Sequence, residues 1–212
     1  MHLSGDPEGV YTVALISNGT LTGTTPLGEN DIYILTFTAP FTLQQVLQVG
    51  TPQDDLLSWL VRDETTQTLY GYTRGSFPGF TNPDQEVLPF VQRRTLDGTL
   101  LWTYQLPVMV ANTIPCIPCP GGDVLCMWDD DTADFHLLRL GGDDGTVQWE
   151  RTYPPEQAGE RWFWVDVDPA ENILIHLQEE APSGTHTFAL VQLDPTGQER
   201  WRHPLPQPFI HH

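Results

Sequence analysis

The chain has 212 residues and a formal net charge of −19, with 28 Asp and Glu residues against nine basic residues, all of them Arg. A surface of this sign repels phosphate backbones and anionic lipid, so the composition argues against nucleic-acid binding and against attachment to a membrane surface. Nineteen Pro and eighteen Gly punctuate a sequence rich in Val, Thr, Leu and aromatic residues, which predicts many short strands joined by turns and almost no helix.

Hydrophobic patterning also argues against membrane insertion. No stretch approaches 18 uninterrupted apolar residues, so we expect no transmembrane span. The opening residues MHLSGDPEGV are polar and acidic, and we therefore expect no signal peptide in the given sequence.

Strand-like runs fall into four groups of four along the chain. The first group covers 10–17, 19–25, 31–38 and 43–50, and the second covers 56–63, 67–73, 88–94 and 99–106. The third covers 108–114, 123–128, 134–140 and 146–153, and the fourth covers 161–168, 172–178, 186–194 and 198–205. Four strands in about 50 residues is the usual length of one blade of a β-propeller.

A Gly four residues before a Trp recurs in the last three groups. The pairs are Gly98/Trp102, Gly145/Trp149 and Gly197/Trp201. In each, the Gly is expected to close the hairpin between the third and fourth strands with a positive φ, helped by a nearby Asp that favours turns. The Trp then lies on the fourth strand, where its ring can cover the joint with a neighbouring sheet while its indole N–H reaches a carbonyl. In the first group, Val46 occupies the place of the Trp.

These patterns predict an all-β fold, a β-propeller built from four four-stranded antiparallel blades. We expect one domain over 1–212 with repeats at about 9–50, 51–106, 107–154 and 157–206. Four blades can close on themselves, or form part of a larger or oligomeric propeller.

The second repeat resembles a bacterial family of tandem β-propeller repeats, the SBBP type. The likeness rests on LYGYTRGSFPG (69–79) and FVQRRTLDGTLLWTYQL (90–106), preceded by Asp54 and Asp55. The third and fourth repeats keep the turn and the Trp but lose the Tyr-x-Gly-x-Thr strand. The resemblance implies a propeller on a secreted or cell-surface protein, used for adhesion, scaffolding or recognition.

One cysteine cluster is a candidate metal site. Cys116, Cys119, Cys126 and His136 could supply four zinc ligands, whereas a structural disulfide, inert thiols or a redox pair are the alternatives. The acidic run from Asp129 to Asp134 and the turn at 141–145 could gather oxygen ligands for Ca²⁺, although the spacing is not that of an EF-hand. No cofactor is otherwise expected.

The long loop at 74–87 is the predicted binding surface. Tyr72, Arg74, Phe77 and Phe80 are its candidates, because loops carry function and aromatic residues and Arg are enriched at binding hot spots. Alternatively, Phe77 and Phe80 hold the loop onto its own sheet.

No catalytic constellation stands out in the sequence. We therefore expect a non-enzymatic propeller that recognises a protein or glycan, or that assembles as a structural subunit, with self-assembly among the options. The alternative is a propeller-based hydrolase or lyase with an acidic, metal-assisted central site.

Overall fold

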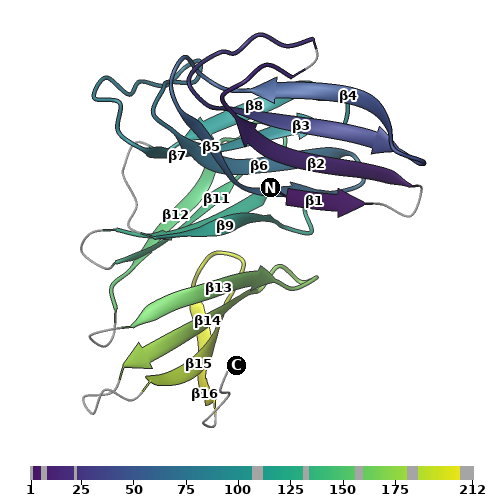
Figure 1. Ribbon diagram of the computed structural model, residues 1–212. Coiled ribbons are helices and arrows are strands. Elements are labelled where there is room, and N and C mark those ends of the chain that lie inside the picture. Colours follow the sequence, from purple (N-terminus) through teal and green to yellow (C-terminus); the bar gives the residue numbers. More distant parts are fainter. Residues whose placement is uncertain are drawn as a thin grey trace. The chain divides into compact units, whose positions relative to one another are not determined.

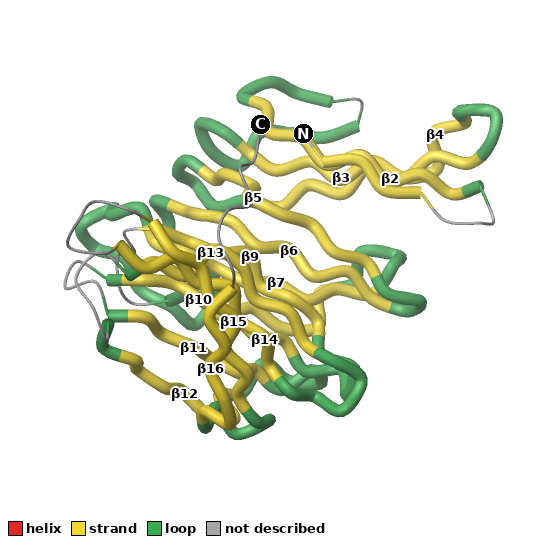
Figure 2. Tube along the Cα trace, turned by 90° about the horizontal axis from the view of Figure 1, so that it is seen from below, coloured by secondary structure: helices red, strands yellow, loops and turns green. Residues whose placement is uncertain are grey.

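The computed structural model describes residues 2–5, 9–21, 23–106, 112–130, 134–155, 160–180 and 186–205. Every regular element in these ranges is a strand, as the yellow segments of Figure 2 show. The predicted all-β class is therefore confirmed for this part of the chain.

The strands form four four-stranded antiparallel sheets in which chain neighbours pair with one another (Figure 1). The chain divides into two compact units, Met1–Met109 and Val110–His212, which we describe separately. In unit 1, the first sheet contains β1 (His2–Gly5), β2 (Val10–Ser17), β3 (Asp31–Thr38) and β4 (Thr42–Val49), and the second contains β5 (Asp55–Arg62), β6 (Thr66–Thr73), β7 (Leu88–Thr95) and β8 (Leu100–Gln105).

Unit 2 repeats this arrangement. The third sheet contains β9 (Asn112–Pro118), β10 (Val124–Asp129), β11 (Phe135–Leu140) and β12 (Val147–Tyr153). The fourth contains β13 (Arg161–Val167), β14 (Ile173–Glu180), β15 (His186–Leu193) and β16 (Glu199–Leu205). The second, third and fourth predicted groups each correspond to one sheet, and the first group corresponds to a sheet in three of its four strands.

Two strand predictions are wrong. The described residues of 19–25, which are 19–21 and 23–25, do not form a strand. This Thr- and Gly-rich segment lacks alternating apolar residues, and Thr24 N donates a hydrogen bond to Leu21 O. β1 supplies the fourth strand of the sheet instead. In the third sheet, β9 spans Asn112–Pro118 and not 108–114, of which residues 108–111 lie outside the described residues. Pro115 and Pro118 are tolerated there because β9 is an edge strand, whose free side needs no N–H donor.

Each unit has one hydrophobic core between its two sheets. In unit 1 the core includes Ile32, Ile34, Leu60, Leu69 and Phe90 from the first and second sheets. In unit 2 it includes Leu125, Leu137, Ile175, Leu177 and Val191 from the third and fourth. Alternate residues of β3, β11, β14 and β15 face these cores, as the period of a half-buried strand requires.

The recurring turns have the predicted form. Gly98, Gly145 and Gly197 have φ of 91°, 69° and 83°, a region that favours glycine. In each of the three turns a carboxylate caps the backbone: Asp97 accepts a hydrogen bond from Thr99 N at 3.1 Å, Asp144 accepts one from Thr146 N at 3.0 Å, and Asp194 accepts one from Thr196 N at 2.8 Å. Hydrogen bonds from neighbouring Thr hydroxyls and from these N–H groups lower the pKa of all three carboxyls.

A β-bulge precedes each recurring Trp. The pairing shifts register between β7 and β8, β11 and β12, and β15 and β16, just before Trp102, Trp149 and Trp201 pair with the third strand. In the first sheet the residue after the equivalent bulge is Gln45, so the position matching the Trp is Gln45 and not Val46.

In unit 2, the last strand of the third sheet holds the last turn of the fourth. The Trp149 indole donates to Pro195 O at 3.1 Å, Arg151 Nε donates to Thr196 O at 3.2 Å, and the Tyr153 hydroxyl donates to Gly197 O. The three donors alternate along β12, so they lie on one face of the strand. The predicted bond from a recurring Trp to a carbonyl is thus present at Trp149.

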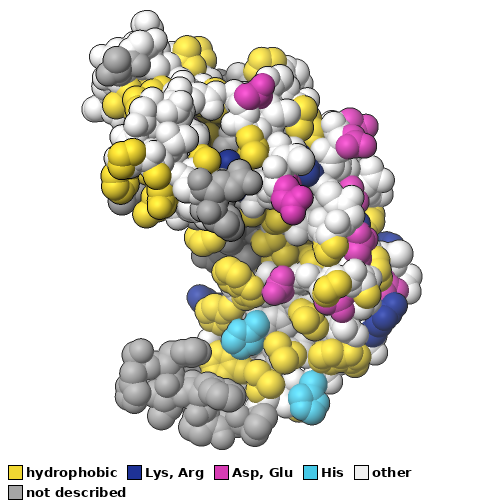
Figure 3. Space-filling view, turned by 90° about the vertical axis from the view of Figure 1, so that its right-hand side faces the viewer, with side chains coloured by type: hydrophobic (Ala, Val, Ile, Leu, Met, Phe, Trp, Pro, Cys, Tyr) yellow, Lys and Arg dark blue, Asp and Glu magenta, His cyan; other side chains and the backbone are white. Residues whose placement is uncertain are grey.

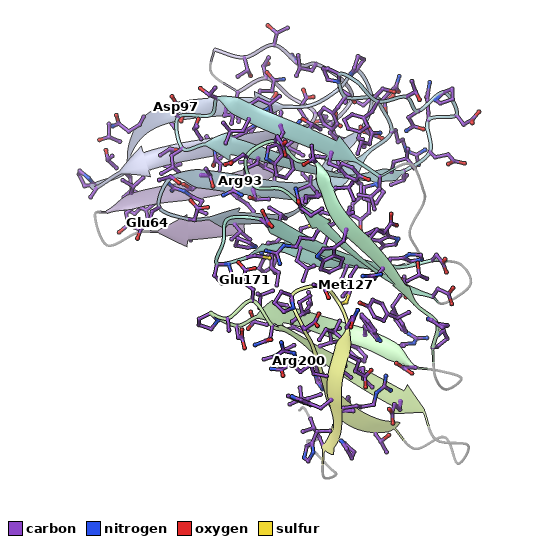
Figure 4. All side chains as sticks on the ribbon, turned by 180° about the vertical axis from the view of Figure 1, so that it is seen from behind. Glu64, Arg93, Asp97, Met127, Glu171 and Arg200 are labelled. Carbon is purple, nitrogen blue, oxygen red and sulfur yellow. A yellow bond between two sulfur atoms is a disulfide. The ribbon has the colours of Figure 1, made fainter. Side chains whose placement is uncertain are left out.

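In unit 1, β4 holds the β7–β8 turn of the second sheet in the same way. The Gln45 amide donates to Asp97 O, and Asp97 is labelled in Figure 4. A Cβ placed on Gly98 would lie 3.2 Å from Leu47 Cδ1. The donor is Gln45 here and Trp149 in unit 2, but in both units the last strand of one sheet contacts the last turn of the following sheet. We call this contact the strand–turn clasp.

The clasp at Gly197 predicts a large cost for adding a methyl group. A Cβ there would lie 2.8 Å from Tyr153 Oη and 3.0 Å from Arg151 Cγ, whereas one on Gly122, at a similar φ of 94°, meets nothing within 4 Å. Gly122→Ala should therefore cost about 1 kcal/mol through φ alone. Gly197→Ala should cost at least about 1 kcal/mol more, because it also crowds the clasp. Urea unfolding of both variants measures the difference, and equal costs would contradict a close-packed clasp.

Candidate interaction surface

The predicted loop surface is largely part of the unit 1 core. Phe77 is only 4% exposed and packs on Phe90, with ring centroids 4.7 Å apart, so its expected exposure is wrong. Phe80 is half-buried and contacts the Tyr104 ring edge-on. Both rings hold the loop onto its own sheet.

The other two loop candidates differ in exposure. Tyr72 is half-buried beside Tyr70, and burial raises the pKa of its hydroxyl. Arg74 is exposed, and its guanidinium donates to Gln85 O within the same loop. Of the four predicted residues, only Arg74 offers most of its side chain to solvent.

The four predicted metal ligands do not come together as one site. Cys116 and Cys126 form a disulfide between β9 and β10, leaving Cys119 as a free, buried thiol. His136 lies between Asp130 and Thr152, with its Nε2 3.0 Å from Asp130 Oδ2 and its Nδ1 3.2 Å from Thr152 Oγ1. The structural disulfide is the alternative that this arrangement supports.

Cys119 belongs to the core of unit 2. It packs with Leu125 and Met127, and Met127 is labelled in Figure 4. Burial raises the pKa of its thiol to about 11, so the thiol is protonated at neutral pH and poorly nucleophilic.

The acidic loops also form no metal site in the described part of the chain. Asp131 lies outside the described residues, and Asp130 pairs with His136. No group of three or more His, Cys, Asp or Glu side chains within the described ranges is placed to hold a metal ion.

Two buried carboxylates meet where β3 and β5 begin. Asp31 is 1% exposed and Asp55 is fully buried, and a Cβ on Gly50 would lie 2.3 Å from Asp31 Oδ1 and 3.1 Å from Asp55 Oδ2. Asp55 accepts bonds from Thr51, whereas Asp31 Oδ1 has no hydrogen-bond partner among the described residues. Burial raises the pKa of Asp55, and the nearby Asp31 charge adds to that rise.

The fourth sheet presents a second face, opposite the unit 2 core, that is rich in aromatic and apolar residues. One row of paired residues crosses all four strands on this face, and each residue in it pairs with the next on the neighbouring strand: Trp164, His176, Leu190 and His203. The face also carries Phe163, Leu174, Phe188, Trp201 and Leu205. His176 lies between Phe163 and Phe188, with ring centroids 6.4 and 5.5 Å away. We call this surface the fourth-sheet outer face. Figure 3 shows hydrophobic side chains close to histidines on one side of the molecule.

The first sheet also has an apolar face opposite its core. One row of paired residues crosses its four strands: Leu3, Val13, Leu35 and Val46. A second row lies nearer the β3–β4 turn and consists of Tyr11, Phe37 and Leu43. At that turn Phe41 is exposed, has a φ of 81° and stacks on Tyr11 with centroids 5.9 Å apart. We call this surface the first-sheet outer face.

Comparisons with models of known protein families and with curated proteins find no match to this chain. No helix in the described ranges is long and apolar enough to cross a membrane.

Sequence reasoning missed both outer faces because it assigned the recurring aromatic residues to packing between sheets. Phe135 and Phe188 occupy equivalent places, yet Phe135 is buried and Phe188 is only partly covered.

Thiol titration should confirm the cysteine arrangement. Native protein should not react with a thiol reagent, because Cys119 is buried and protonated. Unfolding without reductant should expose one thiol per chain, and unfolding with reductant should expose all three. More than one reactive thiol before reduction would contradict the disulfide.

Asp31→Asn should stabilise the protein at alkaline pH. Since the folded-state pKa of Asp55 is raised, folding favours its protonated form and stability falls as pH rises through that pKa. The Asn amide removes the neighbouring charge and replaces the unpaired oxygen with a donor, while its own oxygen can keep the bonds from Leu27 N and Gln48 Nε2. We expect about 1 kcal/mol more stability at pH 8 and a weaker pH dependence.

Asp84→Asn, at an exposed loop position, is the matched control and should leave the pH dependence unchanged. Urea unfolding between pH 5 and 8 supplies the measurement. Equal destabilisation by Asp31→Asn at every pH would show that the two carboxylates do not repel one another.

Proposed function

We propose that the chain forms a non-enzymatic β-propeller, or a segment of one, that acts by contact as a recognition module or structural subunit. Four similar four-stranded sheets and the two strand–turn clasps support the proposal. Consecutive propeller blades pack face to face in this way, each covering the apolar face of its neighbour.

The fourth-sheet outer face is the observation that carries this proposal. Trp164 and Trp201 are 49% and 42% exposed there, beside Phe163 and Leu190. Clustered exposed aromatic residues are typical of protein-binding surfaces, and Trp is enriched at binding hot spots. Contact with a protein surface therefore accounts for residues that would otherwise leave apolar area in water.

An oxidising compartment suits this function. The Cys116–Cys126 disulfide supports a secreted or cell-surface location, because such bonds persist outside the reducing cytosol. The resemblance of the second repeat to tandem propeller repeats points to the same setting.

Photo-crosslinking in the producing cells tests the proposal. A photoreactive phenylalanine analogue in place of Trp164 should give discrete crosslinked species, because the partner covers this face. The same analogue in place of the exposed Asp84 should give none. Trp201→Glu should abolish the crosslinks from position 164. An absence of crosslinks from position 164, or equal crosslinking from position 84, would contradict contact through this face.

A further inference from the structure

Five of the nine arginines are buried or half-buried, and three of these five pair with carboxylates. The ion pairs are Arg93–Asp63, Arg139–Asp123 and Arg202–Glu179, at 3.3, 2.7 and 3.4 Å. The other two, Arg62 and Arg94, form no ion pair with a carboxylate among the described residues. In a chain with 28 Asp and Glu residues, this pairing pattern needs an explanation.

These two arginines lie in one row on one face of the second sheet. Arg62 pairs with Gln67 on the next strand, and Gln67 pairs with Arg94 on the strand after it. Residues directly opposite one another in an antiparallel sheet share a face. The adjoining row on this face includes Leu60 and Leu69 of the unit 1 core. The arginine row therefore faces the first sheet, within unit 1.

A polar row of the first sheet lies on the same side of the core. It consists of Thr12, Thr36 and Gln45, which pair in register, two residues from core positions on their strands. Arg62 Nη1 donates to Thr12 Oγ1 and so joins the two rows. We call the six residues of both rows the inter-sheet arginine site.

The guanidinium groups of this site are incompletely compensated. Arg62 Nε is shielded from solvent and has no hydrogen-bond partner among the described residues. Arg94 donates to neutral oxygens, which are Gln92 Oε1 at 3.0 and 3.1 Å and Gly98 O at 2.8 Å. Burial lowers the pKa of Arg94, yet a guanidinium stays charged in proteins. A counter-anion would offset the cost of shielding these charges from water.

The carboxylates that neighbour these arginines in the sequence are engaged elsewhere. Asp63 pairs with Arg93, whose side chain lies on the opposite face of the sheet. Asp97 accepts the Thr99 N–H within its own turn. The described residues thus supply two positive charges at this site and no negative charge.

We propose that the inter-sheet arginine site binds a tetrahedral oxyanion, either free phosphate or sulfate or the end group of a phosphate or sulfate ester. Two guanidinium charges match a phosphate group, which carries about −1.5 to −2 at pH 7. Arginine holds such groups through paired N–H donors, and the Thr36 hydroxyl can donate to a further oxygen. This site and the contact proposed through the fourth sheet are separate properties, and neither requires the other.

The acidity of the chain makes the proposal specific. A net charge of −19 opposes the binding of anions over most of the surface. An anion that binds therefore needs a local group of donors, and titration should reveal one saturable site per chain.

Thermal unfolding of the purified full chain tests the site. Phosphate at about ten times its dissociation constant should raise the midpoint by about 4 °C relative to NaCl of equal ionic strength. Arg62→Gln and Arg94→Gln should each weaken phosphate binding about tenfold or more, because each removes charge-assisted hydrogen bonds. Arg161→Gln is the matched control: it removes the same charge from an exposed position and should leave phosphate binding unchanged.

The comparison between variants is decisive, because phosphate also stabilises proteins by exclusion from their surface. Equal stabilisation of wild type, Arg62→Gln and Arg94→Gln by phosphate would overturn the site. Arg62→Lys keeps the positive charge but loses the fork of donors, so it should fold and bind phosphate with intermediate affinity.

Calorimetric titration of the wild type distinguishes the two sources of the oxyanion. Tighter binding of phenyl phosphate than of inorganic phosphate would assign the site to an ester, and binding of inorganic phosphate alone would assign it to a free ion. No saturable binding of phosphate, sulfate or phenyl phosphate would overturn the proposal.

Discussion

Three side chains at alternate positions of β12 donate hydrogen bonds to three consecutive carbonyls of the β15–β16 turn, and this clasp joins the third sheet to the fourth. Its geometry depends on the bulge before Trp149, which sets the face that the Trp occupies, and on Gly197, whose missing side chain leaves room for the Tyr153 hydroxyl. Ion pairs reinforce it at one side: Arg139 contacts Asp123 and Glu171, each at 2.7 Å, and Glu171 is labelled in Figure 4. In unit 1 the related contact is made by the Gln45 side-chain amide, which donates to Asp97 O. The clasp therefore requires a side-chain hydrogen-bond donor at this position, and this donor need not be an indole.

Some parts of this fold can be predicted from the sequence and others cannot. Alternating apolar residues and Gly turns predict the second and fourth sheets to within about two residues, because these signals are local. The sequence did not predict β1, because a strand of four residues shows too little periodicity. Residues 19–25 were wrongly predicted to be a strand, because Thr occurs in both strands and turns. The loop candidates failed for another reason: a Phe in a loop does not reveal whether its ring packs inward, as Phe77 does, or meets solvent. The metal candidate failed because equal spacings serve a zinc site and a disulfide.

The outer faces of the first and fourth sheets are both apolar in an otherwise strongly acidic protein. Burying apolar area yields about 25 cal/mol per Å², so an uncovered sheet face favours association until something covers it. The high net charge limits non-specific contacts elsewhere on the surface.

Solvent exchange of the seven Trp indole N–H groups, followed by NMR, tests the clasp most directly. The indole of Trp149 should be protected, because it is bonded to Pro195 O. The indole of Trp201, a residue that is 42% exposed, should exchange rapidly. Equal and rapid exchange of Trp149 and Trp201 would contradict the clasp.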